Sequence, residues 1–142
     1  YRGGDETLRS ALALGEAMQL TNILRDVGED LRMGRCYLPS ELLDKHGVTR
    51  SGLEAARVTP GYAALLEELA ETAAGLYRQG WQGIPKLHGV AATAVGVAAL
   101  NYEGILHKLR RNGYDNLTQR AYLRPVERLV LIPRAVYSVY SA

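Results

Sequence analysis

The stretch Gln19-Leu-Thr-Asn-Ile-Leu-Arg-Asp-Val-Gly-Glu-Asp30 determines the fold predicted for this chain of 142 residues. Its residues favour a helix, on which Asn22, Asp26 and Asp30 would lie four positions apart along one face. Acidic side chains at this spacing repel one another, and a divalent cation would remove the repulsion. Amide and carboxylate oxygens suit Mg²⁺, which usually keeps its other positions for water and substrate phosphates. The stretch therefore predicts a helix that handles a diphosphate.

The position of this acidic stripe relative to the apolar residues sharpens the prediction. At about 100° per residue, Gln19 and the three oxygen-bearing residues fall within an arc of roughly 80°. Ile23 and Val27 fall in the neighbouring sector, so the stripe borders the apolar face and could line the mouth of an apolar cavity. A lone Asp-x-x-x-Asp pair would more often be the solvated end of a surface helix. The additional Gln19, Asn22 and Arg25, and the basic turn that follows, favour a binding site instead.

Two motifs carry a resemblance to a known family. The first stretch, continued by Leu31-Arg-Met-Gly-Arg-Cys-Tyr-Leu-Pro39, closely resembles the second aspartate-rich segment of the squalene and phytoene synthase family. The residues of this motif are most similar to the phytoene branch. The same is true of a second motif, Gly113-Tyr-Asp-Asn-Leu-Thr-Gln-Arg-Ala-Tyr122. The resemblance runs over nearly the whole chain. It implies an all-α protein that is part of the isoprenoid (terpenoid) synthase helical fold.

The resemblance also implies what the chain leaves out. Members of this family carry an earlier aspartate-rich motif on a facing helix, and a Tyr-x-x-Val-Ala-Gly-type segment before the second motif. Neither is found in this sequence, which begins at Tyr1. We therefore expect residues 1–142 to be the C-terminal half of a single domain, to have the missing N-terminal half as their partner, and to be inactive alone.

The resemblance assigns roles residue by residue. It implies metal binding by Asn22, Asp26 and Asp30, and it makes the two aspartates catalytic. By sequence alone, Tyr102 would be a core tyrosine and Arg120 a surface charge. The resemblance instead places both among the residues that contact the substrate diphosphate or its magnesium ions: Gln19, Asn22, Arg25, Tyr102 and Arg120. For Arg32 and Arg35, phosphate binding and a favourable position at a helix C-terminus are equally open.

The implied reaction is a head-to-head condensation of two geranylgeranyl diphosphates to phytoene in carotenoid biosynthesis, with release of diphosphate. The implied cofactor is Mg²⁺, for which Mn²⁺ can substitute, and it would neutralise charge on the leaving group. The allylic cation needs a dry pocket, which residues 90–100 could help to line. Two alternatives stay open. One is squalene or dehydrosqualene synthesis from farnesyl diphosphate, and the other is a non-catalytic helical homologue that binds a prenyl diphosphate.

Composition narrows the choice of partners. The net charge of +2 is too small to argue for nucleic acid, so we expect none. A single cysteine, Cys36, excludes an internal disulfide, and three widely spaced histidines do not suggest a zinc site. We expect a cytoplasmic protein. Because prenyl substrates are lipophilic, we also expect peripheral association with membranes.

The helical pattern predicts several elements. A first helix should run from Asp5 to about Arg32, and Gly28 within it suggests close packing or a bend near the acidic residues. Residues 90–100 are small and apolar, which favours a helix buried among other helices. The further helices are expected over residues 40–46, 60–80, 90–111 and, bent or broken near Pro125 and Pro133, over much of 118–140.

Overall fold

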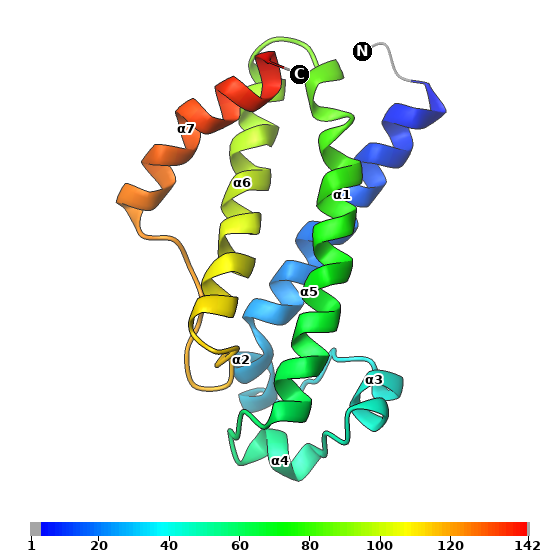
Figure 1. The fold of residues 1–142 in the computed structure, drawn as a ribbon, viewed down its shortest axis with the longest axis vertical. Helices are drawn as coiled ribbons and strands as arrows, with labels where there is room; N and C mark the ends of the chain where they lie inside the picture. Colours follow the sequence, from blue (N-terminus) through cyan, green and yellow to red (C-terminus); the bar gives the residue numbers. More distant parts are fainter. Residues whose placement is uncertain (1–3, 142) are drawn as a thin grey trace.

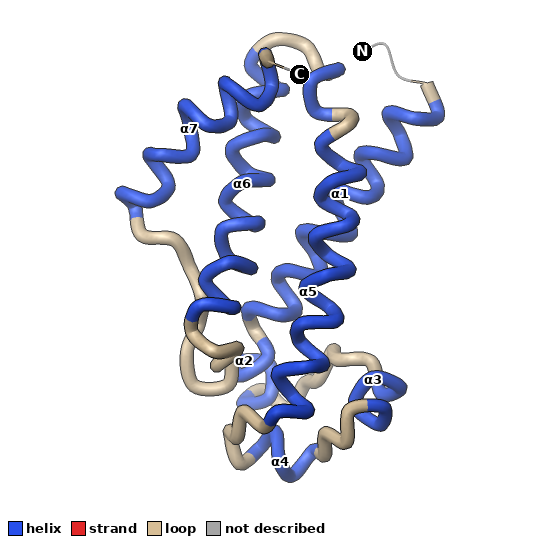
Figure 2. The backbone as a smooth tube through the Cα atoms, viewed as in Figure 1, coloured by secondary structure: helices blue, strands red, loops and turns tan. Residues whose placement is uncertain are grey.

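The computed structural model describes residues 4–141, and these contain helices joined by loops, with no strand (Figure 1; Figure 2). The all-α class predicted from the sequence is confirmed. Four helices are long: α1 (Asp5–Arg25), α5 (Pro60–Trp81), α6 (Val90–Arg111) and α7 (Pro125–Tyr140). The short elements are α2 (Val27–Arg32), α3 (Ser40–Lys45), α4 (Arg50–Glu54) and the 3₁₀ turn η1 (Ile84–Lys86).

Helix α5 begins where its sequence predicts. The side-chain oxygen of Thr59 accepts a hydrogen bond from the backbone N–H of Tyr62 at 3.1 Å, which caps the helix. Pro60 occupies the first turn, where its missing N–H does no harm. The helical spacing then directs one face into the core, through Tyr62, Leu65, Leu66, Leu69, Ala70, Ala73 and Tyr77.

The core is built around the packing of α1 on α5, which run side by side (Figure 1). A buried polar contact joins them, because the hydroxyl oxygens of Thr21 and Tyr77 lie 2.7 Å apart. Thr21 also donates to the backbone oxygen of Ala17 at 2.7 Å. Burial raises the pKa of Tyr77, so its hydroxyl keeps its proton. Both buried hydroxyls are therefore satisfied inside an otherwise apolar interface.

The acidic segment is not one continuous helix, which corrects the prediction of a single helix to Arg32. Helix α1 ends at Arg25, and Asp26 leaves helical geometry with φ −105° and ψ 12° before α2 begins. The bend expected from Gly28 near the acidic residues is confirmed, since Gly28 is buried just after the break. The break lies at the lower end of the molecule, where the connection from α6 to α7 passes beside α2 (Figure 1).

Helix α6 is a buried helix among other helices over residues 90–100, as expected. Its Gly96 faces Ala135 and Val139 of α7, and Ala92 and Ala99 are buried. These small residues therefore serve helix packing. Among residues 4–141, no helix is long and apolar enough to cross a membrane.

Helix α7 begins later than expected, at Pro125, and residues 118–124 are not helical. It continues through Pro133, so of the predicted bend or break at that residue a break is excluded. Pro133 cannot donate to the carbonyl of Leu129, but both residues lie on the exposed side of the helix, where water can take that bond. The start of α7 is held by Glu127, which accepts from the backbone N–H of Arg124 at 2.6 Å and from Lys108 of α6 at 2.9 Å.

Close packing of α1 on α5 makes Gly80 sensitive to a methyl group. A Cβ there would lie 2.9 Å from the Cβ of Leu14, whereas at Gly75 in the same helix the nearest atom is the Arg78 guanidinium at 3.6 Å. We expect Gly80→Ala to lower the free energy of unfolding by about 1–3 kcal/mol. Gly75→Ala should raise it by roughly 0.5–1 kcal/mol. Urea denaturation of the full-length protein measures both, and equal effects would contradict the packing.

The anchor of α7 predicts an acid-sensitive contact. Hydrogen bonds from Lys108 and from the Arg124 backbone lower the pKa of Glu127 from 4.5 to about 2. A pKa lowered by folding stabilises the protein above the unfolded value, and this contribution is lost as pH falls through the folded value. Glu127→Gln should therefore lower the melting temperature at pH 6, and the difference from the native protein should shrink between pH 4.5 and pH 2. A difference that is constant across this range would refute the assignment.

Candidate functional site

The acidic stripe keeps its register across the helix break. The backbone N–H of Asp26 donates to the oxygen of Asn22 at 3.0 Å, and that of Asp30 donates to the oxygen of Asp26 at 2.8 Å. All three residues are half-buried. Asn22, Asp26 and Asp30 therefore remain four residues apart along one hydrogen-bonded line, as the sequence predicts, although they belong to two helices and the break between them.

Asp26 lies between two arginines. The Nε and Nη2 groups of Arg25 donate to its two carboxylate oxygens at 2.8 and 2.9 Å. The Nε group of Arg120 donates to the Oδ1 atom at 3.1 Å. Burial raises the pKa of Asp26, but the hydrogen bonds and charges of the two arginines outweigh it and hold the pKa below its usual value. Asp26 is therefore an ionised carboxylate with a cation on each side.

The sequence alone predicts that Arg120 is a surface charge, but it does not predict its contact with the acidic segment. Its side chain is 54% exposed, as a surface charge would be, but it comes from a loop 94 positions further along the chain and reaches the acidic segment. It also lies 3.8 Å from the carboxylate of Glu29. The structure thus brings together Arg25, Asp26 and Arg120, three of the residues that the resemblance assigned to the site.

A small pocket of about 160 Å³ opens beside this cluster. Three arginines line it, Arg25 and Arg32 from the helices and Arg120 from the loop, together with one carboxylate, Glu29, and residues 116–119. Guanidinium groups bind phosphate oxygens through paired N–H donors. The pocket therefore has the chemistry of an anion site and includes Arg32, for which the sequence left phosphate binding open.

Tyr102 and Gln19, which were also predicted to be site residues, make no hydrogen bond to Asp26. Tyr102 is half-buried on α6 and packs against the main core. Its hydroxyl is near enough to Arg25 to contribute to that residue's raised pKa, after the larger effect of the hydrogen bond to Asp26. Gln19 is exposed on α1, and the structure gives it no hydrogen bond to another described residue. Tyr102 thus lies beside Arg25, while Gln19 lies on α1 on the N-terminal side of Asn22.

Asn22, Asp26 and Asp30 carry side-chain oxygens of the kind that bind hard metal ions. The side-chain oxygen of Asn22 is buried and has no hydrogen-bond partner among the described residues, as is also true of side-chain oxygens of Asn101, Asn112 and Tyr114. Within residues 4–141, no three carboxylate, histidine or cysteine side chains come together. The available donors are two carboxylates, Asp26 and Asp30, and the Asn22 amide, and Mg²⁺ is an ion that takes one or two carboxylates and completes its shell elsewhere.

Asn116 was not predicted to be a site residue from the sequence. It is 2% exposed, and it connects the loop between α6 and α7 to the acidic segment. Its Nδ2 group donates to the backbone oxygen of Leu24 at 2.6 Å, and its own backbone oxygen accepts from Gly28 at 3.0 Å. The hydroxyl of Tyr62 donates to its Oδ1 atom. Its only signal in the sequence was its place in the second motif, Gly113–Tyr122.

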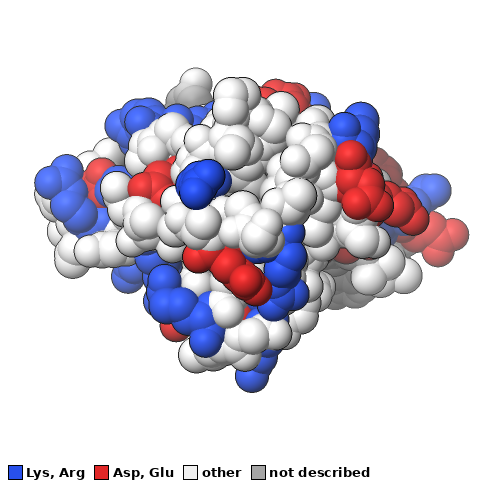
Figure 3. Space-filling model, turned by 90° about the horizontal axis from the view of Figure 1, so that it is seen from below, with Lys and Arg blue, Asp and Glu red and all other residues white. Residues whose placement is uncertain are grey.

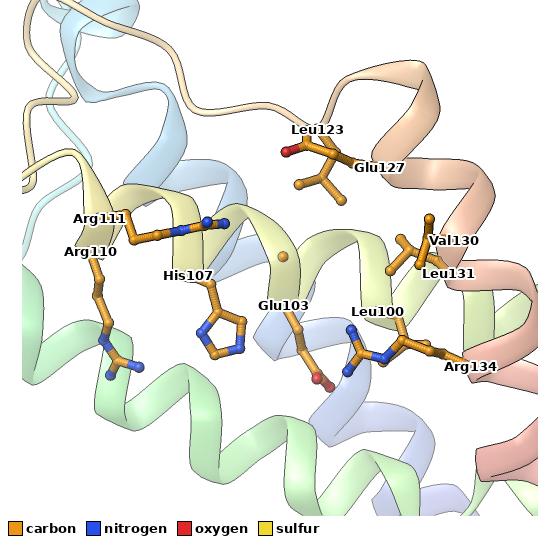
Figure 4. A pocket seen from close by; sticks show the side chains of 11 residues that line it. Leu100, Glu103, His107, Arg110, Arg111, Leu123, Glu127, Val130, Leu131 and Arg134 are labelled. Atoms are coloured by element: carbon orange, nitrogen blue, oxygen red, sulfur yellow. The ribbon is translucent and has the colours of Figure 1, made fainter.

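A larger cavity, of about 570 Å³, lies between α6 and α7. None of the predicted metal- or diphosphate-contacting residues lines it, but Leu100, from the stretch predicted to help line an apolar pocket, does. Figure 4 shows Glu103, His107 and Arg110 projecting from α6 on the side of α5. Glu103 accepts from the Trp81 indole at 2.5 Å, and Arg110 is bound to Glu67 of α5 at 2.9 Å. Burial raises the pKa of Glu103, opposed by that indole bond. Glu103 and Arg110 therefore already have hydrogen-bond partners on α5.

The surface at the lower end of the molecule carries charges of both signs. Figure 3 shows Lys and Arg beside Asp and Glu on this face. Several are joined in ion pairs, such as Lys45 with Glu68 at 3.0 Å and Arg50 with Glu54 at 3.1 Å. Such exposed pairs contribute little to stability. The acidic segment therefore stands out by its half-buried carboxylates and not by net charge.

The helical architecture, with an acidic segment flanked by arginines, is that of the all-α isoprenoid synthases. Residues 1–127 match the family described as squalene/phytoene synthase, which is of prenyltransferase type. The chain belongs to this family.

Similar curated proteins are phytoene synthases. The chain is 55% identical over 133 residues to the phytoene synthase of Thermus thermophilus, an alignment that covers 94% of this chain and 46% of the relative. It is 39% identical over 135 residues to phytoene synthase 3 of Zea mays, which covers 94% of this chain and 32% of the relative. The chain thus spans less than half of the length of either relative.

Solved structures with the same fold are named for related products. A dehydrosqualene synthase in complex with a ligand superposes with a TM-score of 0.83 at 34% identity, over 94% of this chain and 47% of that one. The squalene synthase HpnC of Alicyclobacillus acidocaldarius superposes with a TM-score of 0.74 at 29% identity, over 79% and 43% of the two chains. The predicted isoprenoid synthase fold is therefore confirmed.

Proposed function

We propose that the protein containing this chain condenses two geranylgeranyl diphosphates head-to-head to phytoene, with release of diphosphate, in carotenoid biosynthesis. The observation that carries the proposal is the meeting of Arg25, Asp26 and Arg120 beside a small pocket lined by arginines. The choice of phytoene among the products of the family is supported by 55% identity to a phytoene synthase.

The arginines are suited to hold a diphosphate. Arg120 donates only its Nε–H group to Asp26, and its terminal amino groups make no hydrogen bond to a described residue. Arg25 and Arg32 line the same pocket. A diphosphate entering the pocket would meet three guanidinium groups, which bind phosphate oxygens strongly in a partly desolvated site. These residues would orient the substrate by its charged end.

We propose Mg²⁺ as the cofactor, with Mn²⁺ as a substitute, held by Asp26, Asp30 and the side-chain oxygen of Asn22. The unpartnered buried oxygen of Asn22 and the hard oxygen donors support this assignment. When bound, the ion would neutralise charge that develops on the leaving diphosphate. Backbone hydrogen bonds from Asp26 to Asn22 and from Asp30 to Asp26 hold the three residues at successive helical turns.

This chain provides two carboxylates to such a site, and it spans 46% of the Thermus relative. We propose that the other half of the site comes from a facing helix outside this chain, with its own aspartate-rich motif. Activity then requires both halves, and the 142 residues alone are expected to be inactive.

A second function has a specific observation in its favour. The chain superposes well on a dehydrosqualene synthase, with a TM-score of 0.83. Synthesis of squalene or dehydrosqualene from farnesyl diphosphate would use the same diphosphate site, because the two substrates differ only in their apolar tails. Tail length is set by the depth of the pocket, to which the other half of the domain would contribute.

The deciding experiment assays the full-length protein with geranylgeranyl and farnesyl diphosphate, each with and without Mg²⁺. Phytoene formed only with the metal is the expected result. A C30 product from farnesyl diphosphate, and none from the longer substrate, would replace the proposal by the second function. No product from either substrate would leave a non-catalytic prenyl-diphosphate-binding homologue, and titration with inorganic diphosphate would then measure binding.

Asp26 offers the sharpest test within the chain. In the full-length protein, Asp26→Ala should abolish turnover, and Asp26→Asn should retain the fold but lose at least about 10²-fold in Mg²⁺-dependent turnover, since it removes a charge at the site. Asp44→Asn on α3, an exposed carboxylate, is the matched control and should leave turnover unchanged. Normal turnover by either Asp26 variant would show that the metal assignment is wrong.

A further inference from the structure

The break between α1 and α2 leaves two backbone groups that a continuous helix would pair. In such a helix the N–H of Gly28 would donate to the carbonyl of Leu24. Here the N–H of Gly28 donates to the backbone oxygen of Asn116 at 3.0 Å, and the carbonyl of Leu24 accepts from the Nδ2 group of Asn116 at 2.6 Å. One residue, 92 positions after Leu24, therefore replaces both ends of the missing helical hydrogen bond.

Glycine at position 28 is what allows this approach. A Cβ atom at Gly28 would lie 2.7 Å from the backbone oxygen of Asn116, and it would also collide with the backbone of Leu117. Neither neighbour is the flexible end of a side chain, so the loop itself would have to move. Gly28 and Asn116 thus form a matched pair, in which the missing side chain of one admits the backbone of the other.

Asn116 is also held from its far side. Its Oδ1 atom accepts from the hydroxyl of Tyr62, a buried residue of α5. Burial raises the pKa of Tyr62, so the hydroxyl keeps the proton that it donates. Asn116 therefore connects three segments: the end of α1, the start of α2 and helix α5. Its side chain is thus bonded through both its amide nitrogen and its oxygen, and the bond to Leu24 is the one that joins the loop to the acidic segment.

That loop carries Arg120. Four residues after Asn116, the Arg120 guanidinium reaches the carboxylate of Asp26, which is the residue at the break. The turn between them is shaped by Asp115, whose Oδ1 atom accepts from the backbone N–H of Thr118 at 3.1 Å. The same contact that completes the broken helix thus brings the arginine to the carboxylate.

We propose that Asn116 is a positioning residue of the diphosphate site, which joins the broken helix at Leu24 and Gly28 and thereby holds Arg120 beside Asp26. This inference rests on the proposed function for its effect on substrate, but the hydrogen-bonded junction itself does not. The two parts can therefore be tested separately in the full-length protein.

The first measurement is hydrogen exchange of backbone amides. Asn116→Asp keeps an acceptor for Tyr62, but an ionised aspartate has no proton to donate to the carbonyl of Leu24. Exchange at residues 28–30 should rise at least tenfold, while amides in the middle of α5 stay unchanged. Tyr62→Phe is the control, because it removes the other bond of the same side chain, and it should change exchange at 28–30 less than threefold. Equal rises in both variants, or none, would overturn the junction.

The second measurement is affinity for inorganic diphosphate with Mg²⁺, by calorimetry, together with KM and kcat for the prenyl substrate. Asn116→Asp should weaken diphosphate binding and raise KM by about tenfold or more, whereas Tyr62→Phe should stay within threefold even where its melting temperature falls equally. Losses that follow the melting temperature in both variants would leave Asn116 a purely structural residue and overturn the positioning role.

A second variant covers the case in which Asn116→Asp does not fold. Gly28→Ala pushes the loop away without touching the Asn116 side chain, and it should weaken diphosphate binding to a similar extent. Gly75→Ala is its matched control on a helix with room for the methyl group. Equal affinity in Gly28→Ala and Gly75→Ala would overturn the proposal. A native protein that turns over no prenyl diphosphate refutes the proposed function, while the exchange result still decides the junction.

Discussion

The structure depends on the rule that buried backbone groups must be paired. Helix α1 stops at Arg25, inside the acidic segment, and this exposes the carbonyl of Leu24 and the N–H of Gly28 in a buried region. Asn116 satisfies both, so the connection from α6 to α7 must pass beside α2. The position of Arg120, and hence the charge around Asp26, follows from that one pairing.

The core supports this arrangement from the other side. Helix α5 packs along α1, and it contributes both Tyr77, which meets Thr21 of α1, and Tyr62, which meets Asn116. Through these two tyrosines α5 contacts both α1 and the loop. Because protein interiors are densely packed, such contacts transmit small shifts. The site is consequently coupled to the packing of the whole helical core.

The electrostatics of the site describe a receptor for an anion. Asp26 is flanked by Arg25 and Arg120, and the nearby Arg32 completes a pocket with three guanidinium groups and few carboxylates. The side-chain oxygen of Asn22, one helical turn before Asp26, is buried and has no hydrogen-bond partner among residues 4–141. Surplus donors and an unpaired acceptor in one place favour a ligand that carries both phosphate oxygens and a cation.

The sequence by itself determined those features that depend on neighbours along the chain. Helical periodicity fixed α5 and α6, the Thr59 cap fixed where α5 begins, and four-residue spacing fixed the line from Asn22 to Asp30. Even the bend near Gly28 could be anticipated, because glycine weakens a helix locally. Only the tertiary structure decided where the helix breaks, why Asn116 matters and where Arg120 points. Those outcomes rest on hydrogen bonds between residues more than 90 positions apart, and no local pattern records which distant loop will complete a broken helix.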